Sequence, residues 1–141
     1  MNPRRAYPAF APRGPNLYIG AAPQFHDNHV FGSTLLFNLL MGRRWPPRLE
    51  DFDAAARVCR ELGLGPLLDR MPAGLHQQVG ETGWQLSHGE QSRVFVARSL
   101  LQTLDMRVLD ESFAALDAST LDQVLDVVLA HPQALVVIAH P

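Results

Sequence analysis

Residues Leu86–Arg93 read LSHGEQSR and lead directly into an apolar run that ends near Leu101. Ser87 and Glu90 have the spacing of a capping box: the serine hydroxyl accepts a hydrogen bond from the Glu90 N–H, and the Glu90 carboxylate accepts one from the Ser87 N–H. A helix is therefore predicted to begin here. Because Gly89 allows close backbone approach and the first N–H groups of a helix attract anions, the stretch is a candidate phosphate-binding surface. A capped helix start that binds nothing is the simpler alternative.

The composition indicates one globular domain. The chain has 141 residues, of which 47% are hydrophobic and 18% charged, so it is long enough to bury a core. A net charge of −2 and scattered arginines leave no basic surface for nucleic acid. The single Cys59 lies in a helical pattern and indicates a buried thiol in a reducing compartment. No apolar run reaches the length of a transmembrane helix.

The N-terminal residues 1–15 contain four prolines and no continuous apolar segment, so they do not form a signal peptide and are expected to be disordered. A short strand is predicted within residues 16–22. In the polar loop that follows, His26 and His29 have the spacing of a metal-binding pair, but no third ligand lies nearby in the sequence. We therefore interpret them as loop residues.

Two helices are predicted next. Ser33-Thr34 precedes an apolar helix through Met41 that stops at Gly42 in a left-handed conformation. Asp51 is expected to cap the second helix, and Gly63 to close it. The apolar residues of that helix recur at helical spacing, namely Ala55, Val58, Cys59 and Leu62.

The last third of the chain has a strand, helix, strand pattern. Met106–Leu109 reads as a strand in which Arg107 argues against full burial. The following helix carries one continuous apolar stripe that is expected to pack on the core. Ala134–Ala139 is uninterrupted apolar, which predicts a strand buried on both faces of a parallel sheet. The stripe consists of Leu121, Val124, Leu125, Val128 and Leu129.

Three polar residues follow the two predicted strands. Because ligands of open parallel sheets bind at the carboxyl ends of the strands, Asp110, Glu111 and His140 are expected at one edge. One carboxylate could hold a divalent cation through water while the other polarises an attacking water. His140 would then contact the developing negative charge. The alternative is a solvated Asp-Glu turn and a histidine without a role.

Taken together, these residues resemble the nucleotide-binding domain of ATP-binding cassette (ABC) transporters. LSHGE over residues 86–90 is similar to the LSGGQ signature, with departures at His88 and Glu90. Met106–Glu111 resembles a Walker B segment with its catalytic glutamate, and Ala114–Asp117 resembles the D-loop, with Ser112 where the family usually has proline. The loop Gln78–Gly83 resembles the segment that precedes the signature in exporter-type members and contacts the membrane domain. Two single residues complete the likeness: Gln24 as the Q-loop glutamine and His140 as the switch histidine.

The resemblance implies a role for each matched residue. Asp110 would hold Mg²⁺ through water, with Gln24 as a further Mg²⁺ ligand, and Glu111 would be the general base. His140 would touch the γ-phosphate of ATP. The signature residues Ser87, His88, Gly89 and Glu90 would face the γ-phosphate of a nucleotide held by a second nucleotide-binding domain in a head-to-tail dimer, and Asp117 would lie at that interface.

The fold implied is α/β: part of a P-loop NTPase core of the ABC ATPase type, with parallel strands plus the α-helical signature subdomain. Residues 16–141 would form the C-terminal part of the domain, divided into a helical subdomain over about 30–101 and a Walker B to H-loop segment over about 102–141. The partners implied are a second nucleotide-binding domain and an ABC transmembrane domain, at the cytoplasmic side of the membrane.

One motif of the family is not found in the sequence. No G-x-x-x-x-G-K-[ST] phosphate loop occurs in the 141 residues, and all twelve basic residues are arginine. We therefore expect a fragment of a domain that hydrolyses ATP to power export, inactive alone and aggregation-prone through an unpaired strand edge. The alternative is a non-catalytic module that supplies its signature to a composite ATP site on a partner. A mispredicted gene start is a third interpretation.

Overall fold

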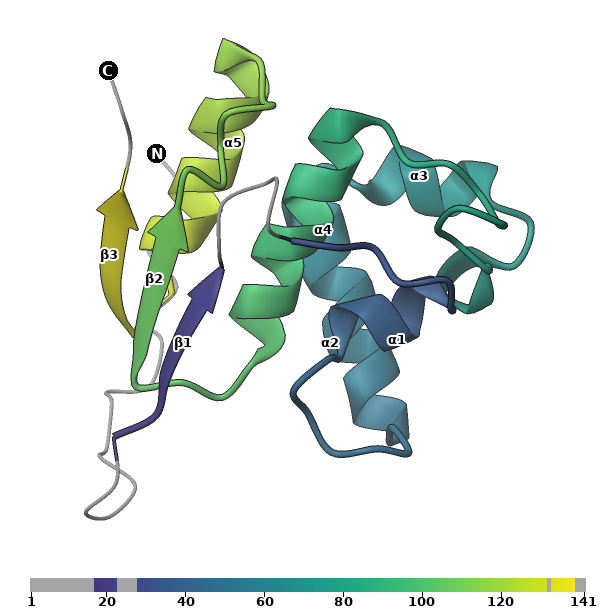
Figure 1. Ribbon diagram of the computed structural model, residues 1–141, viewed down its shortest axis with the longest axis horizontal. Helices are drawn as coiled ribbons and strands as arrows, with labels where there is room; N and C mark the ends of the chain where they lie inside the picture. Colours follow the sequence, from purple (N-terminus) through teal and green to yellow (C-terminus); the bar gives the residue numbers. More distant parts are fainter. Residues whose placement is uncertain (1–16, 23–27, 132, 139–141) are drawn as a thin grey trace.

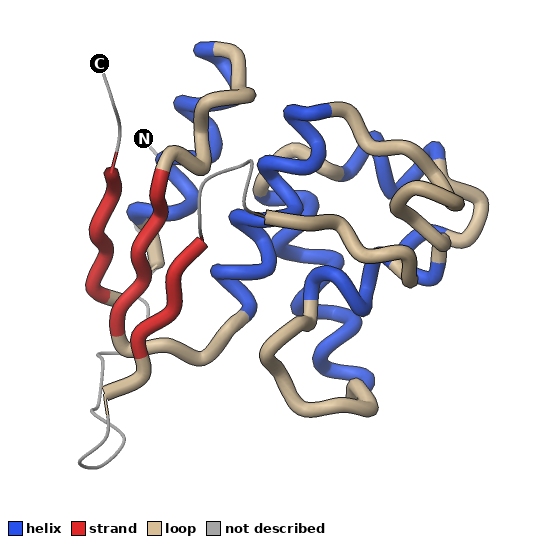
Figure 2. The backbone as a smooth tube through the Cα atoms, in the orientation of Figure 1, coloured by secondary structure: helices blue, strands red, loops and turns tan. Residues whose placement is uncertain are grey.

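A computed structural model describes residues 17–22, 28–131 and 133–138. The chain is α/β, with three parallel strands in the order β1-β2-β3 and a group of helices beside them (Figures 1 and 2). The strands are β1 (Ile19–Ala22), β2 (Met106–Asp110) and β3 (Ala134–Ile138). The helices are α1 (Leu35–Leu39), α2 (Leu49–Glu61), α3 (Gly65–Arg70), the 3₁₀ turn η2 (Gly74–His76), α4 (His88–Leu101) and α5 (Ala118–Leu129).

Helix α4 stands between the sheet and helices α1, α2 and α3, whereas α5 lies beside the sheet (Figure 1). From Val94 to Leu101 every residue of the helix is buried, on all of its sides and including Arg98 and Ser99. Such a helix needs partners all round, and it packs on α1, α2 and β1. This confirms the helix predicted from residue 87 to about 101 and makes it the centre of the core.

Helix α2 confirms the predicted apolar face, because Ala55, Val58, Cys59 and Leu62 are all buried. Burial raises the pKa of the Cys59 thiol to about 12, so the thiol stays protonated at neutral pH. The cap was predicted wrongly. The helix begins at Leu49, and Asp51 lies in its first turn, where its carboxylate accepts a hydrogen bond from the backbone N–H of Arg48 at 2.7 Å.

Helix α1 begins as predicted, with the Thr34 hydroxyl accepting from the N–H of Phe37 at 3.1 Å. It ends at Leu39 and so does not reach Met41. Gly42 adopts the predicted left-handed conformation, with a φ of +84°.

The sheet is covered on one face. Because side chains alternate along a strand, the register places Ala22, Arg107 and Leu109 together on the face that packs against the helices, and all three are buried. The opposite face is apolar and much more exposed. It carries Ile19, Ala21, Met106, Val108, Ala134, Val136 and Ile138.

Strand β3 is not buried on both faces, which corrects the prediction from its sequence. Val136, Val137 and Ile138 are each exposed by 41% or more, because within the described residues β3 pairs only with β2. An all-apolar run indicates that a strand can be buried in a parallel sheet, but it does not indicate whether that strand is central or lies at the edge.

Arg107 also corrects its prediction, because it is buried, with only 1% exposed. Its Nε donates to the carbonyl and hydroxyl oxygens of Ser99 on α4 at 3.1 and 2.8 Å, and its Nη1 donates to Oε1 of Gln133 at 3.3 Å. These acceptors replace water, so the charge can lie in the core. Burial lowers the pKa of Arg107 to about 10 and leaves it protonated at neutral pH.

The apolar stripe of α5 packs only in part. Val124 and Val128 are buried, Leu121 and Leu125 are half-buried, and Leu129 is 69% exposed. The helix lies against one side of the sheet (Figure 1), and Leu129 at its last turn is on the side that faces solvent.

Candidate functional site

The turn before α4 has the geometry that its sequence predicts. Ser87 is the N-cap; its Oγ accepts from the N–H of Glu90 at 3.2 Å, and the Glu90 Oε2 accepts from the N–H of Ser87 at 2.9 Å. Ser87 and His88 are exposed, and Gly89 is half-buried. The capping box therefore fixes the helix start while leaving its outer surface open.

Arg70 is an addition that the sequence pattern did not reveal. From the end of α3 its Nη2 contacts the other oxygen of Glu90 at 2.5 Å. A carboxylate at a helix start opposes the binding of an anion there, and this arginine compensates its charge. The departure from glutamine to Glu90 in the signature is thus matched by a cation from a neighbouring helix.

The signature turn lies beside the segment that precedes α5. A Cβ added at Gly89 would stand 3.5 Å from the carbonyl oxygen of Ala115. Two residues further along, Asp117 caps α5 through hydrogen bonds from the N–H and hydroxyl of Thr120, both at 2.9 Å. The hydrogen bonds from Thr120 lower the pKa of Asp117, backbone N–H first. Two capped helix starts therefore adjoin each other.

The carboxyl end of β2 carries the predicted pair of acids. Asp110 pairs in register with Ile138 at the end of β3, and the Glu111 N–H donates to the Ile138 carbonyl at 2.9 Å. Glu111 has a φ of +47°, which is costly for a residue with a side chain. Strained residues of this kind are concentrated at functional sites.

Gln24 and His140 fall outside the described residues. The chain leaves β1 at Ala22, next to Leu109 of β2, and leaves β3 at Ile138, next to Asp110. Both predicted residues therefore follow strands that end at the same edge of the sheet as Asp110 and Glu111. Within the part of the chain that the structure describes, no three His, Cys, Asp or Glu side chains cluster as a metal site.

Arg98 is a buried organising residue that the sequence reading missed. From α4 it donates to the carbonyl of Asn38 at 2.7 Å, the side chain of Asn28 at 2.9 Å and the carbonyl of His29 at 3.0 Å. Burial lowers its pKa. It ties the segment that follows β1 to α4 and α1. An arginine within the apolar run 94–101 was the signal that could have identified it.

Arg93 and Gln123 join three helices at the end of α2. Arg93 donates to the carbonyl of Gly89 at 3.1 Å and to that of Gly63 at 2.8 Å, while Gln123 of α5 donates to the carbonyl of Glu61 at 3.1 Å. The carbonyls at the end of a helix lack intrahelical partners, so these donors satisfy them. The signature turn and α5 are thereby held at one point.

The loop Gln78–Gly83 is ordered by contacts with the segment before α1. The Val79 N–H donates to the carbonyl of Ser33 at 2.9 Å, and the Leu35 N–H donates to that of Gln77 at 2.9 Å. The Gln85 side chain closes the loop by donating to the Gly80 carbonyl at 2.8 Å.

A three-stranded parallel sheet with acids at its carboxyl edge, beside a capped helix start, places the chain in the α/β class. Sequence comparison finds the ATP-binding/permease protein IrtB for mycobactin import of Mycolicibacterium thermoresistibile, 38% identical over 82% of this chain and 20% of its own length. An ATM1-type heavy metal exporter of Novosphingobium aromaticivorans is 35% identical over 79% of this chain and 17% of its own. CydC, a glutathione/L-cysteine transport system ATP-binding/permease protein of Escherichia coli, is 41% identical over 70% and 16%.

Comparison of structures gives the same result. A bacterial Atm1-family ABC exporter, solved with ATP bound, matches with a TM-score of 0.72 and 29% identity over 88% of this chain and 21% of that one. No protein-family model matches. The chain belongs to the ABC transporter family, and it spans about a fifth or less of the length of these relatives. None of the described helices is both long and apolar enough to cross a membrane.

Proposed function

We propose that this chain is the signature-bearing part of the ATP-hydrolysing domain of an ABC exporter. The observation that carries the proposal is the open, capped start of α4 with Gly89 beside the carbonyl of Ala115. Helix N–H groups at that surface suit the γ-phosphate of ATP. The 141 residues contain no phosphate loop and no lysine to grip the β- and γ-phosphates, so the chain alone hydrolyses no ATP.

The acids at the end of β2 suit the remaining roles. A single Asp110 that acts through water fits Mg²⁺, which keeps most of its waters and takes few protein ligands. Glu111 follows Asp110 at the carboxyl end of β2 in a strained backbone conformation, and a carboxylate at this edge suits the general base that accepts a proton from the attacking water. Gln24 and His140, as a further Mg²⁺ ligand and a γ-phosphate contact, complete the proposed set. Bound Mg²⁺ would supply charge neutralisation of the phosphates.

The proposed partners follow from the two exposed caps. Ser87, His88, Gly89 and Glu90 would complete the ATP site of a second nucleotide-binding domain, with Asp117 at the same interface. The loop Gln78–Gly83, held against the segment before α1, would contact a transmembrane domain at the cytoplasmic side of the membrane.

The test uses an intact nucleotide-binding domain from an ABC exporter whose own signature serine has been replaced by arginine. Adding the 141-residue chain in excess should raise the ATPase rate of that domain by about tenfold or more, since one well-placed donor to a transition state is worth that much. The chain alone should give no turnover above background.

Two variants of the chain test the role of residues 87–90, and a third is their control. Ser87→Arg and Gly89→Asp should abolish the stimulation, because they place a bulky side chain or a second negative charge at the surface that meets phosphate. Asp69→Asn, which changes an exposed residue of α3, should stimulate as the parent does. Equal stimulation by all three variants would refute the proposed role of the signature.

A second candidate function is a binding module that supplies only its signature and never forms part of a hydrolysing domain. The compensated charge of Glu90 favours it, because Arg70 prepares this surface for an anion independently of the β2 acids. Glu111→Gln distinguishes the two. The substitution should leave the stimulation by the isolated chain unchanged under either function. If the chain is part of a hydrolysing domain, the substitution should abolish the ATP turnover that appears once a phosphate-loop segment is joined to the chain.

A further inference from the structure

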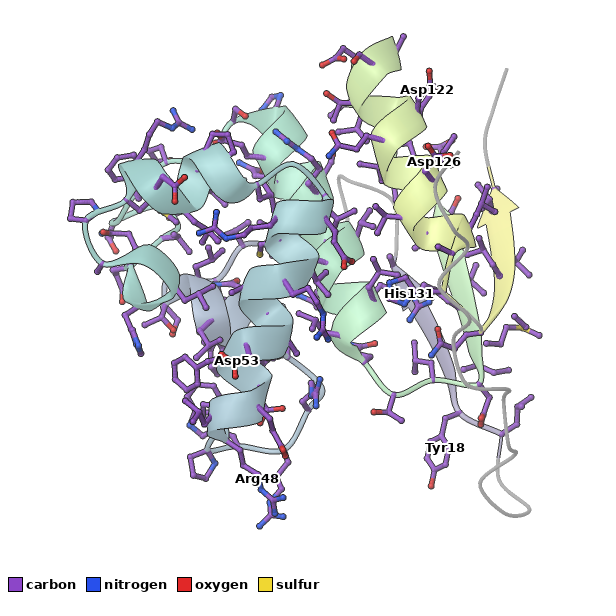
Figure 3. All side chains as sticks on the ribbon, turned by 180° about the vertical axis from the view of Figure 1, so that it is seen from behind. Tyr18, Arg48, Asp53, Asp122, Asp126 and His131 are labelled. Carbon is purple, nitrogen blue, oxygen red and sulfur yellow. The ribbon has the colours of Figure 1, made fainter. Side chains whose placement is uncertain are left out.

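A cavity of about 480 Å³ opens at the end of the sheet opposite to the Asp110 edge. Four segments line it. Tyr18 lies just before β1, Arg44 in the turn after α1, Arg48 at the start of α2, and Thr103 between α4 and β2. Tyr18 and Arg48 stand at the same end of the molecule in Figure 3. The volume is within the range of small-molecule sites, about 300–1,000 Å³.

Three arginines line this cavity, and two of them are available to a ligand. The Arg43 guanidinium is occupied, since it donates to the Leu101 carbonyl at 2.9 Å and contacts Asp51 at 2.8 Å. Arg48 is 62% exposed and makes one long contact with Glu50 at 3.7 Å. Arg44 is exposed, and within the described residues nothing holds its guanidinium.

The carboxylates of the lining do not cancel this charge. Asp51 is half-buried and already shared between Arg43 and the Arg48 N–H. Glu50 is 76% exposed, so water screens its long contact with Arg48. Three arginines against two carboxylates leave a net positive charge at a concave surface.

The backbone of the turn after α1 is held by contacts with the end of α4. Gly42 turns with a φ of +84°, and a Cβ there would lie 2.9 Å from the Gln102 side chain. That amide donates to the Met41 carbonyl at 3.0 Å. The turn that carries Arg43 and Arg44 is thereby fixed to the end of α4.

We propose that this cavity binds a phosphate-bearing anion through Arg44 and Arg48; its lining also includes Tyr18 and Thr103, whose side chains carry hydroxyl groups. Guanidinium groups recognise phosphate oxygens through paired N–H donors, which suits them to this ligand class. The proposal does not rest on the proposed function, because the cavity opens at the other end of the sheet from the acids of β2.

The test is titration of the ¹⁵N-labelled chain with pyrophosphate at low ionic strength. Amide shifts at Arg44, Arg48 and Thr103 should move together, whereas those over residues 87–90 report separately on the signature turn. Arg44→Gln and Arg48→Gln should each weaken binding by about tenfold, the loss expected for one charge-assisted contact. Arg60→Gln is the matched control, because Arg60 is 58% exposed and paired with Asp69 outside the cavity.

A second arm separates a soluble ligand from a lipid headgroup. Vesicles of phosphatidylcholine with and without phosphatidic acid are sedimented with the parent chain and the three variants. Binding to pyrophosphate that depends on Arg44 and Arg48 supports a soluble ligand; binding only to phosphatidic acid vesicles with the same dependence supports a lipid. If neither probe binds, or if Arg60→Gln weakens binding as much as Arg44→Gln, the site is refuted.

Discussion

Arg107 is more deeply buried than any other charged side chain in the described part of the chain, and its contacts explain why it is tolerated. Its guanidinium connects β2 to α4 through Ser99 and to the segment before β3 through Gln133. Sequence alone argued against its burial because a charged side chain in a core strand is costly without partners. The partners lie 8 and 26 residues away, so no local pattern could reveal them.

Replacing Arg107 tests this arrangement. Arg107→Ala should lower the free energy of unfolding by about 2–4 kcal/mol, because it opens a cavity and removes the Arg107 donors to the Ser99 hydroxyl and carbonyl, of which the carbonyl retains only the Gln102 N–H. Arg107→Met retains the volume and should cost less, about 1–2 kcal/mol. Urea denaturation measures both. Arg60→Ala, at an exposed site, should stay within about 0.5 kcal/mol of the parent, and an equally small effect of Arg107→Ala would contradict a structural role.

The turn at Ser87 shows how far single residues can be predicted. The capping box follows from two residues three positions apart, and the structure confirms it. Arg70 could not be predicted to join it, since it is 20 residues earlier and reaches Glu90 only in the tertiary structure. The local hydrogen bonds of this turn could therefore be predicted from the sequence. The ion pair that neutralises Glu90 could not, because it depends on tertiary structure.

At the scale of elements, the helices were predicted better than the sheet. Helical spacing identified α2 and α4 because one face or all faces of a helix must be buried wherever it lies. The burial of β3 depends on which strands flank it, and the sequence of β3 does not specify its neighbours. The start of α2 was also misplaced, because Asp51 lies inside the first turn and accepts from the N–H of the N-cap residue Arg48.

The loop before the signature offers a test at this scale. A Cβ at Gly83 would lie 2.5 Å from the carbonyl oxygen of Gln78, and because this neighbour is backbone the loop must open. Gly83→Ala should lower the free energy of unfolding by about 1–3 kcal/mol, a typical cost of overpacking. Gly32→Ala is the matched control, since nothing lies within 4 Å of its added Cβ. Thermal unfolding compares them, and equal melting temperatures would disprove the close approach.

At the scale of the whole molecule, His131 lies where α5, the sheet and α2 meet, below the end of α5 in Figure 3. Burial first, and then the charges of Arg107 and Arg57, lower its pKa below the ordinary 6.5. The folded chain therefore prefers neutral histidine. A group with a lowered pKa contributes stability that is fully present above about pH 6.5 and is lost as the pH falls toward the folded pKa.

The free energy of unfolding should thus fall as the pH is lowered below about 6.5, and His131→Gln should flatten that part of the curve. Arg57→Gln should flatten it in part, because one of the two repelling cations is removed. Urea titrations between about pH 5 and 8 measure the effect. A curve that His131→Gln leaves unchanged would assign the pH dependence to other groups.

The exposed face of the sheet determines how the isolated chain behaves in solution. In an intact globular protein such an apolar surface beside an edge strand is covered, and when it is open it favours association between molecules. Val136 lies in the middle of β3 and is 42% exposed, so Val136→Lys adds a charge without disturbing the core. It should weaken self-association by about tenfold while changing the free energy of unfolding by no more than about 0.5 kcal/mol. Leu129→Lys, at an apolar residue of α5 that is 69% exposed, is the control in sedimentation experiments. If it reduces association as strongly as Val136→Lys, the surface responsible is not the sheet.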